Sequence, residues 1–184
     1  MESIGVNIYK SKIDDNFYDF LMTEYGKVET YERLYQNENF WSGSDYNFIN
    51  DSTRGVVESN VMKHAKEYTK RSNFNLRSQW INIQAHDGYF PAHDHVGNVS
   101  YVIYLKVPEY LKNYVGKRPN DIFYAEGAIQ FNYGHKNSLF PNSLVVHPEE
   151  KMILMFPSEL QHYVYPFRDR ESLRVSISGN LDFK

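Results

Sequence analysis

The sequence predicts a mainly β fold with flanking helices, in the form of a sandwich or jelly-roll barrel. Aromatic residues make up 16% of the 184 residues, and side chains of this kind favour strands. From residue 77 onward, short strand-like segments alternate with turns marked by Gly, Pro and Asn. The length suits one domain, in which we expect a helical and loop support at 1–76 and a β core at 77–184.

Two helices are predicted in the N-terminal support, after a short strand at 6–9. Apolar residues recur on one helical face from 14 to 25 and again from 55 to 68. Ser11, Asp14 and Asp15 are all suitable N-caps for the first helix. The segment 36–53 is rich in Asn, Ser, Asp and aromatic residues, which predicts a long surface loop.

The β core is predicted to consist of short strands without intervening helices. They lie at 78–85, 89–95, 98–107, 127–132, 143–146, 151–156, 161–167 and 173–181. Strands at this spacing favour two packed sheets with the helices outside them. The segment 108–126 has the weakest pattern and predicts a lid or a helical excursion.

Composition excludes several classes of protein and partner. The chain has no cysteine, which rules out disulfides, thiolate zinc sites and a cysteine nucleophile. The net charge of −3 disfavours a general nucleic-acid binder. Because no apolar run could span a membrane and no signal peptide is recognisable, we expect a cytoplasmic protein. The oligomeric state is open, and a homodimer is compatible with the sequence.

Candidate metal ligands are found among the seven histidines. His93 and His95 are two residues apart, and in a strand their imidazoles would point from the same face toward one place. A third histidine, His162, would complete one face of a coordination sphere, and imidazole suits Fe, Zn, Cu and Ni. The other histidines are expected to be structural or solvated. They are His64, His86, His135 and His147.

An anion-binding residue is predicted one strand beyond His162. In the segment 173–178, apolar residues alternate with Arg174, Ser176 and Ser178, so that these three side chains share one face. A guanidinium binds carboxylates bidentately, which makes Arg174 a candidate for binding a ligand carboxylate that is distant from the metal. The alternative is an ordinary surface arginine.

Seven short motifs follow one another in a fixed order along the chain. They are Trp-x-Asn at 80–82, Gly88, His-x-His at 93–95, Ser-x-x-x-Tyr-Leu at 100–105, Gly-x-Ile-x-Phe at 127–131, Phe-Pro-Ser-x-Leu-x-His-x-Val-x-Pro at 156–166, and Arg-x-Ser-x-Ser-x-Asn at 174–180. In this order they resemble the Fe(II)/2-oxoglutarate-dependent oxygenases, and most of all a bacterial and phage branch of that family. The resemblance implies a double-stranded β-helix, which is a cupin-like jelly roll with the metal at one mouth of the barrel.

The resemblance also implies roles for individual residues. It makes His93 and His162 ligands of Fe(II), with 2-oxoglutarate and O2 as the other cofactors. The far carboxylate of 2-oxoglutarate would be clamped by Arg174 with the help of Ser176. A hydroxyl from Tyr104 would reach the same carboxylate.

Asn82 would line the pocket. At the position of the third iron ligand, the residue type differs from the one that is usual in the superfamily. Most of these oxygenases carry Asp or Glu two residues after the first histidine, whereas this chain carries His95. We expect His95 to be the third ligand. The alternative is Asp94, which could reach the metal only if the strand broke at His93 and turned that carboxylate inward.

The function that the resemblance implies is hydroxylation of a substrate, with release of succinate and CO2. The substrate is open: it could be an amino-acid side chain in a peptide or protein, or a free small molecule. Two alternatives do not use 2-oxoglutarate. They are a non-catalytic jelly-roll metal-binding module and a cupin-type metalloenzyme with three histidines.

Overall fold

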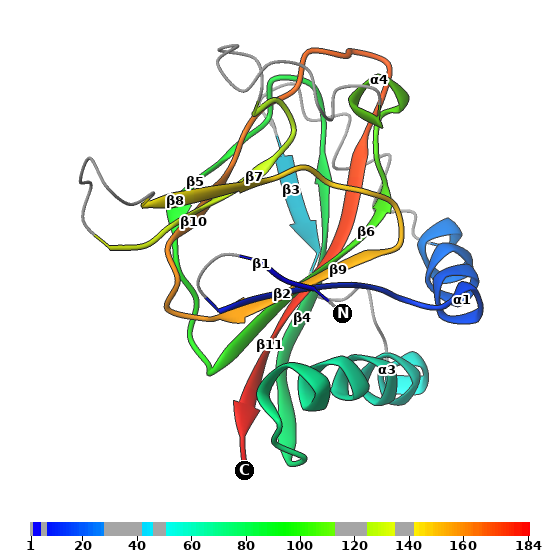
Figure 1. The fold of residues 1–184 in the computed structure, drawn as a ribbon. Helices are drawn as coiled ribbons and strands as arrows, with labels where there is room; N and C mark the ends of the chain where they lie inside the picture. The colour runs from blue at the N-terminus through cyan, green and yellow to red at the C-terminus, as the bar shows by residue number, and fades with distance from the viewer. Residues whose placement is uncertain (1, 5–6, 28–41, 46–50, 113–124, 135–141) are drawn as a thin grey trace.

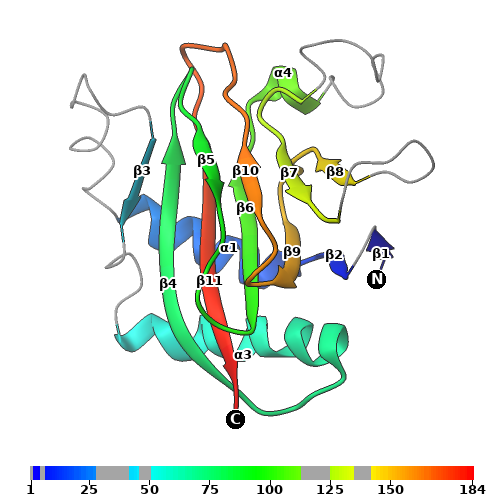
Figure 2. The same cartoon turned by 90° about the vertical axis from the view of Figure 1, so that its left-hand side faces the viewer.

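Two antiparallel sheets face each other in the computed structural model, which describes residues 2–4, 7–27, 42–45, 51–112, 125–134 and 142–184 (Figures 1 and 2). The larger sheet has seven strands in the order β1 (Glu2–Ile4), β2 (Ile8–Lys12), β9 (Met152–Pro157), β6 (Val99–Lys106), β11 (Arg174–Phe183), β4 (Phe74–Gln84) and β3 (Ser42–Asp45). The smaller sheet has four strands in the order β5 (Phe90–His93), β10 (His162–Val164), β7 (Ile129–Asn132) and β8 (Ser143–Val146). This arrangement is the double-stranded β-helix that the sequence predicts.

Two helices cover the face of the larger sheet that is turned away from the smaller one (Figure 2). They are α1 (Asp15–Gly26) and α3 (Asp51–Thr69). The carboxylate of Asp14 caps α1 by accepting a 2.9 Å hydrogen bond from the backbone N–H of Phe17. Leu21 of α1 and Val61 of α3 are completely buried, so each helix places an apolar stripe on the sheet.

The core has two halves, one on each face of the larger sheet. Between this sheet and the helices lie Ile177 and Ile103, among others, and between the two sheets lie Phe131 and Phe156. Alternate residues of one strand therefore enter different halves, as the period of two requires. The inner half also contains polar side chains, and these surround the cavity described below.

All eight predicted core strands are present; four are shorter than predicted, and two of these lose three residues or more. The predicted strand at 89–95 ends at His93, and the one at 161–167 ends at Val164, before the Tyr165-Pro166 pair. Proline has no N–H to donate to a strand ladder, which accounts for the early end of β10. In the segment 108–126, the described residues form only the single-turn helix α4 (Glu109–Lys112); residues 113–124 lie outside the described ranges.

The prediction of one long loop at 36–53 is wrong for its described residues. Strand β3 pairs with β4 within it, and α3 begins at Asp51 rather than near Gly55. The remainder of that segment is outside the described ranges, as are Val6 and His135. Backbone pairing at a sheet edge does not depend on an apolar pattern, which is why Ser-Gly-Ser-Asp gave no strand signal.

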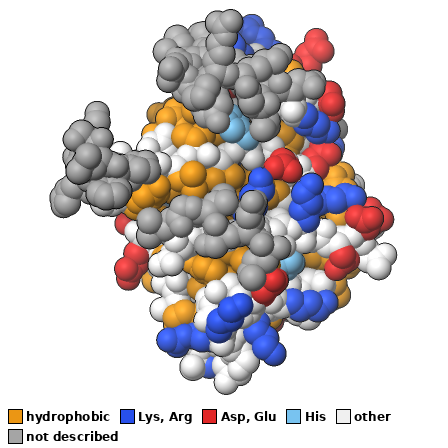
Figure 3. Space-filling model, viewed as in Figure 1, with side chains coloured by type: hydrophobic (Ala, Val, Ile, Leu, Met, Phe, Trp, Pro, Cys, Tyr) orange, Lys and Arg blue, Asp and Glu red, His pale blue; other side chains and the backbone are white. Residues whose placement is uncertain are grey.

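Acidic and basic side chains are interspersed on the face shown in Figure 3, and its described part carries no continuous basic surface. Within the described ranges, none of the helices has both the length and the apolar composition needed to cross a bilayer.

Replacing Gly179 on β11 by alanine is expected to destabilise the fold. A Cβ there would lie 2.5 Å from the hydroxyl oxygen of Tyr101 and 2.6 Å from the carbonyl oxygen of Ser78. Overpacking of this kind costs roughly 1–3 kcal/mol, which a urea unfolding curve would measure. Gly55→Ala is the matched control, because nothing lies within 4 Å of its added Cβ and alanine favours a helix. Equal stability of the two variants would contradict the prediction.

Candidate metal centre

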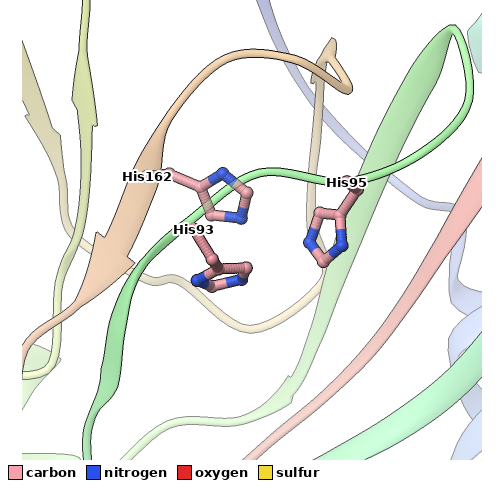
Figure 4. Close-up of side chains that lie close together, drawn as sticks. All are labelled: His93, His95 and His162. Atoms are coloured by element: carbon pink, nitrogen blue, oxygen red, sulfur yellow. The ribbon is translucent and has the colours of Figure 1, made fainter.

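Three histidines converge at one place in the barrel (Figure 4). His93 ends β5 and His162 begins β10, and the two residues are directly paired across these antiparallel strands. Their ring centroids are 4.4 Å apart, and that of His95 lies 4.9 Å from His93 and 5.1 Å from His162. One ring nitrogen from each residue lies within 4.8 Å of the other two, so the cluster could hold one metal ion.

Backbone carbonyl groups fix the tautomers of two of these rings. Nδ1 of His93 donates to the carbonyl oxygen of Pro91 at 2.6 Å, and Nδ1 of His162 donates to that of Leu160 at 2.8 Å. A carbonyl oxygen can only accept, so in the neutral tautomer that these contacts select Nδ1 carries the proton and the lone pair is on Nε2. Hydrogen bonds of this kind orient histidines that bind metals.

His95 joins the cluster for a different reason from the one predicted. The two imidazoles do not share one face of a strand, because β5 ends at His93. Instead, the backbone N–H of His95 donates to the carbonyl oxygen of Ser158 at 2.9 Å, which ties the loop after β5 to the turn before β10. Asp94, the alternative ligand, is exposed and is outside the cluster even though the strand does end at His93.

A buried polar network supports the turn that holds His95. The Ser100 hydroxyl oxygen lies 2.9 Å from that of Ser158 and 2.7 Å from Oδ1 of Asn180, and Nδ2 of Asn180 donates to Ser78 at 3.0 Å. A hydroxyl has one hydrogen and an amide oxygen only accepts, so Ser100 donates to Asn180 and accepts from Ser158. The network connects β4, β6 and β11 to the loop beside the metal cluster.

The three histidines line a cavity of about 240 Å³ between the sheets. The polar residues predicted for the site line the same cavity. They are Asn82, Tyr104, Arg174 and Ser176, together with Ser178. Strand register explains this grouping, because Ser176 is paired with Asn82 on one side and with Tyr104 on the other. No Asp or Glu is among the described residues that line the cavity.

Arg174 is the buried cation of this cavity. Its side chain is 3% exposed, its Nη1 donates to the carbonyl oxygen of Gly127 at 2.7 Å, and its Cζ lies 5.7 Å from the centre of the Tyr104 ring. Burial lowers the pKa of the guanidinium from its ordinary value, but the group remains charged at neutral pH. No carboxylate within the described ranges forms a salt bridge with it. A buried, unneutralised guanidinium suits an anionic ligand.

Comparison with protein families identifies the chain. Residues 78–180, more than half of the chain, match the family described as "Putative 2OG-Fe(II) oxygenase". The chain belongs to this family. Its cofactors are Fe(II), 2-oxoglutarate and O2, and the histidine cluster could bind the iron. Comparison with curated proteins finds no match.

Solved oxygenase structures share the fold of the chain. HygX from Streptomyces hygroscopicus, with nickel and 2-oxoglutarate bound, is 9% identical, with a TM-score of 0.63 over 97% of this chain and 82% of its own. A prolyl-4-hydroxylase from Pseudomonas putida is 15% identical, with a TM-score of 0.57 over 97% and 93%. The viral collagen prolyl hydroxylase of Paramecium bursaria Chlorella virus-1, as a 2-oxoglutarate complex, is 11% identical, with a TM-score of 0.59 over 96% of both chains.

Two imidazoles of the histidine cluster in this oxygenase are in the neutral form that binds a metal cation. Burial, together with a smaller effect of the neighbouring histidines, lowers the pKa of His95 to about 4 and that of His162 to about 3. Both rings are therefore neutral at physiological pH. Metal ligation requires neutral imidazole, so these two residues need no deprotonation before an ion binds.

Sequence reasoning left Trp80 without a role, although the residue lies in the first motif. It lines the cavity beside His95 at a ring-centroid distance of 5.5 Å, and its Nε1 donates to Oδ1 of Asn82 at 3.0 Å. Asn82 in turn donates to the hydroxyl of Ser178 at 2.9 Å. The signal was available, because Trp80 and Asn82 are two residues apart in one strand and so share a face.

The histidines expected to be structural lie apart from the cluster in the described ranges. Nδ1 of His64 is 2.8 Å from the hydroxyl of Tyr9, which joins α3 to β2, and burial lowers the pKa of His64. His86 and His147 are half-buried and are outside the metal cluster.

Acid is expected to destabilise the metal-free protein through the cluster. Between about pH 6.5 and 4 the unfolded chain protonates histidines that stay neutral in the folded state, as the lowered pKa of His95 and His162 requires. The free energy of unfolding should therefore decrease as the pH falls through this interval. Urea unfolding in the presence of a chelator would measure the slope. His162→Gln should reduce the slope, and an unchanged slope would contradict the assignment.

Proposed function

We propose that this oxygenase is a dioxygenase that hydroxylates an organic substrate and converts 2-oxoglutarate into succinate and CO2. The observation that supports it best is a single cavity that contains three converging imidazoles and an unneutralised arginine, with no carboxylate in its described lining. A metal cation and a dianionic 2-oxo acid could both bind in such a cavity.

The residues that would hold the iron are His93, His95 and His162. The carbonyl groups of Pro91 and Leu160 hold the first and the last of these rings, so their Nε2 atoms are the ones offered to the ion. When bound, Fe(II) supplies O2 activation, which couples oxidative decarboxylation of 2-oxoglutarate to insertion of one oxygen atom into a C–H bond of the substrate. The contribution of the chain is placement of the reactants and exclusion of water.

Arg174 would bind the far carboxylate of 2-oxoglutarate. Its buried guanidinium has donors that face the cavity, and Ser176 and Tyr104 lie beside it on the neighbouring positions of the sheet. A hydroxyl from either residue would add a hydrogen bond to the same carboxylate. Asn82, tied to Trp80 and Ser178, gives the cavity a fixed polar wall.

Three neutral ligands would distinguish this centre from one with a carboxylate ligand. Imidazoles leave the charge of the ion at +2, so dianionic 2-oxoglutarate brings the complex to zero, whereas a carboxylate ligand would make it −1. The exposed position of Asp94 supports His95 as the third ligand. The positive cavity also compensates the cost of burying a dianion.

The substrate that we propose is an amino-acid side chain in a peptide or protein. Two of the solved oxygenases that share this fold are prolyl hydroxylases, and this similarity supports the proposal by analogy. Treating cell extracts with and without the enzyme, and scoring products that gain one oxygen atom, would test it. Oxygen gain confined to free small molecules would contradict it.

Loss of the guanidinium is expected to weaken the binding of 2-oxoglutarate. We expect wild-type protein loaded anaerobically with Fe(II) to develop a visible charge-transfer band on addition of 2-oxoglutarate. Arg174→Ala should need about ten to a hundred times more 2-oxoglutarate to reach half of that band, because a charge-assisted pair contributes roughly 1.5–3 kcal/mol.

Arg77→Ala is the matched control, since Arg77 is an exposed arginine on β4 that pairs with Asp182. It should titrate as the wild type does. Metal binding by the wild type without any such band would instead favour the non-catalytic module or the cupin-type enzyme. Equal titration by Arg174→Ala and the wild type would remove Arg174 from the site.

A further inference from the structure

Gln84 is directly paired with Arg174 across β4 and β11. Residues that face each other in this way project from the same side of a sheet, with Cβ atoms roughly 5 Å apart. The Gln84 side chain is completely buried. It lies beside Arg174 in the sheet but is not among the described residues that line the cavity.

The orientation of the Gln84 amide is determined by its donors. Nε2 donates to the carbonyl oxygen of Tyr165 at 3.0 Å and also to that of Gly88. Both partners can only accept, so the amide nitrogen must face them and both of its hydrogens are used. Oε1 then points elsewhere, and it is buried without a hydrogen-bond partner.

Arg174 carries the complementary unsatisfied atom. Its Nε is buried and has no acceptor, whereas its Nη1 is held by the carbonyl oxygen of Gly127. An unsatisfied buried donor and an unsatisfied buried acceptor each cost roughly 1–3 kcal/mol, so placing them on facing residues leaves a strong drive for them to pair.

The same piece of backbone holds both side chains. Gln84 donates to the carbonyl of Tyr165, and Arg174 donates to that of Gly127. These two segments are joined by hydrogen bonds from Gly127 N–H to Pro166 and from Tyr165 N–H to Ala128. The amide and the guanidinium are therefore both anchored, from paired positions of β4 and β11, to the backbone of two segments that are hydrogen-bonded to each other.

We propose that Gln84 is a positioning residue for Arg174, an inference that rests on the proposed role of Arg174 in binding 2-oxoglutarate. When the guanidinium binds the far carboxylate, Oε1 of Gln84 accepts the hydrogen bond from Nε. Nε and Nη1 are then both held by the protein, and the remaining donors are directed into the cavity. A neutral acceptor orients the guanidinium without neutralising it, whereas a carboxylate at this position would compete with the co-substrate.

Two substitutions of Gln84 separate the orientation of the guanidinium from its neutralisation. Gln84→Leu removes the acceptor, and Gln84→Glu puts an anion beside the guanidinium; both remove the donors to Tyr165 and Gly88. In the anaerobic titration of Fe(II)-loaded protein, Gln84→Leu should raise the 2-oxoglutarate dissociation constant about threefold to tenfold, and Gln84→Glu by more than about tenfold. Gln130→Glu is the matched control. It adds the same charge on β7, outside the cavity lining, and should bind 2-oxoglutarate as the wild type does.

Pyruvate distinguishes positioning from general damage to the site. It has the 2-oxo acid group that binds the metal but lacks the far carboxylate, so Arg174 has nothing to clamp. The Gln84 variants should bind pyruvate within about twofold of the wild type, even where 2-oxoglutarate binding is weakened. Equal weakening of both ligands would show that the variants disturb the metal centre, which would overturn the proposal.

A double-mutant cycle keeps the test decisive if Gln84→Glu does not fold. In an Arg174→Met background, Gln84→Leu should cause no further loss of 2-oxoglutarate affinity, because the residue acts only through Arg174. Additive losses would overturn the proposal. If 2-oxoglutarate fails to bind the wild type at all, the proposed function itself is wrong. If it binds the wild type and both Gln84 variants equally, only the role of Gln84 is wrong.

Discussion

The pairing of β11 with β4 and β6 at the centre of the larger sheet is the constraint on which the rest of the structure depends. Because side chains alternate along a strand, this one register sends Ile177 toward the helices and Arg174 and Ser176 into the cavity. A shift of the β11 register by one residue would turn its apolar side chains into the cavity and place the guanidinium in the apolar core beneath the helices. The apolar packing of α1 and α3 therefore also fixes the chemistry on the other face.

The smaller sheet contributes two of the three candidate metal ligands through a single strand pair. His93 and His162 are far apart in the chain but are directly opposed in β5 and β10, and the turn at Ser158 adds His95. The cluster thus rests on two backbone features, a strand register and a turn. The polar network of Ser100 and Asn180 connects that turn to the larger sheet, so both sheets support the centre.

The histidine cluster and Arg174 are related by the charges that they place in one cavity. Burial keeps two of the imidazoles neutral, and the guanidinium has no carboxylate partner in the described part of the chain. In the function that we propose, an ion held by neutral ligands and a buried arginine would both attract an anion, and a dicarboxylate with a 2-oxo group would satisfy both at once. Next to the cavity, Oε1 of Gln84 and Nε of Arg174 are a buried acceptor and a buried donor that each lack a hydrogen-bond partner.

The sequence by itself determined the strands of the core, the two helices and the set of polar residues on one face of β11, because each depends on periodicity along a short segment. It also determined the family, through the order of its motifs. Only the tertiary structure decided that a turn places His95, that part of the predicted loop forms β3 and pairs with β4, and that Gln84 lies opposite Arg174. These features depend on hydrogen bonds between residues that are distant in the chain, and local patterns carry no information about such pairings.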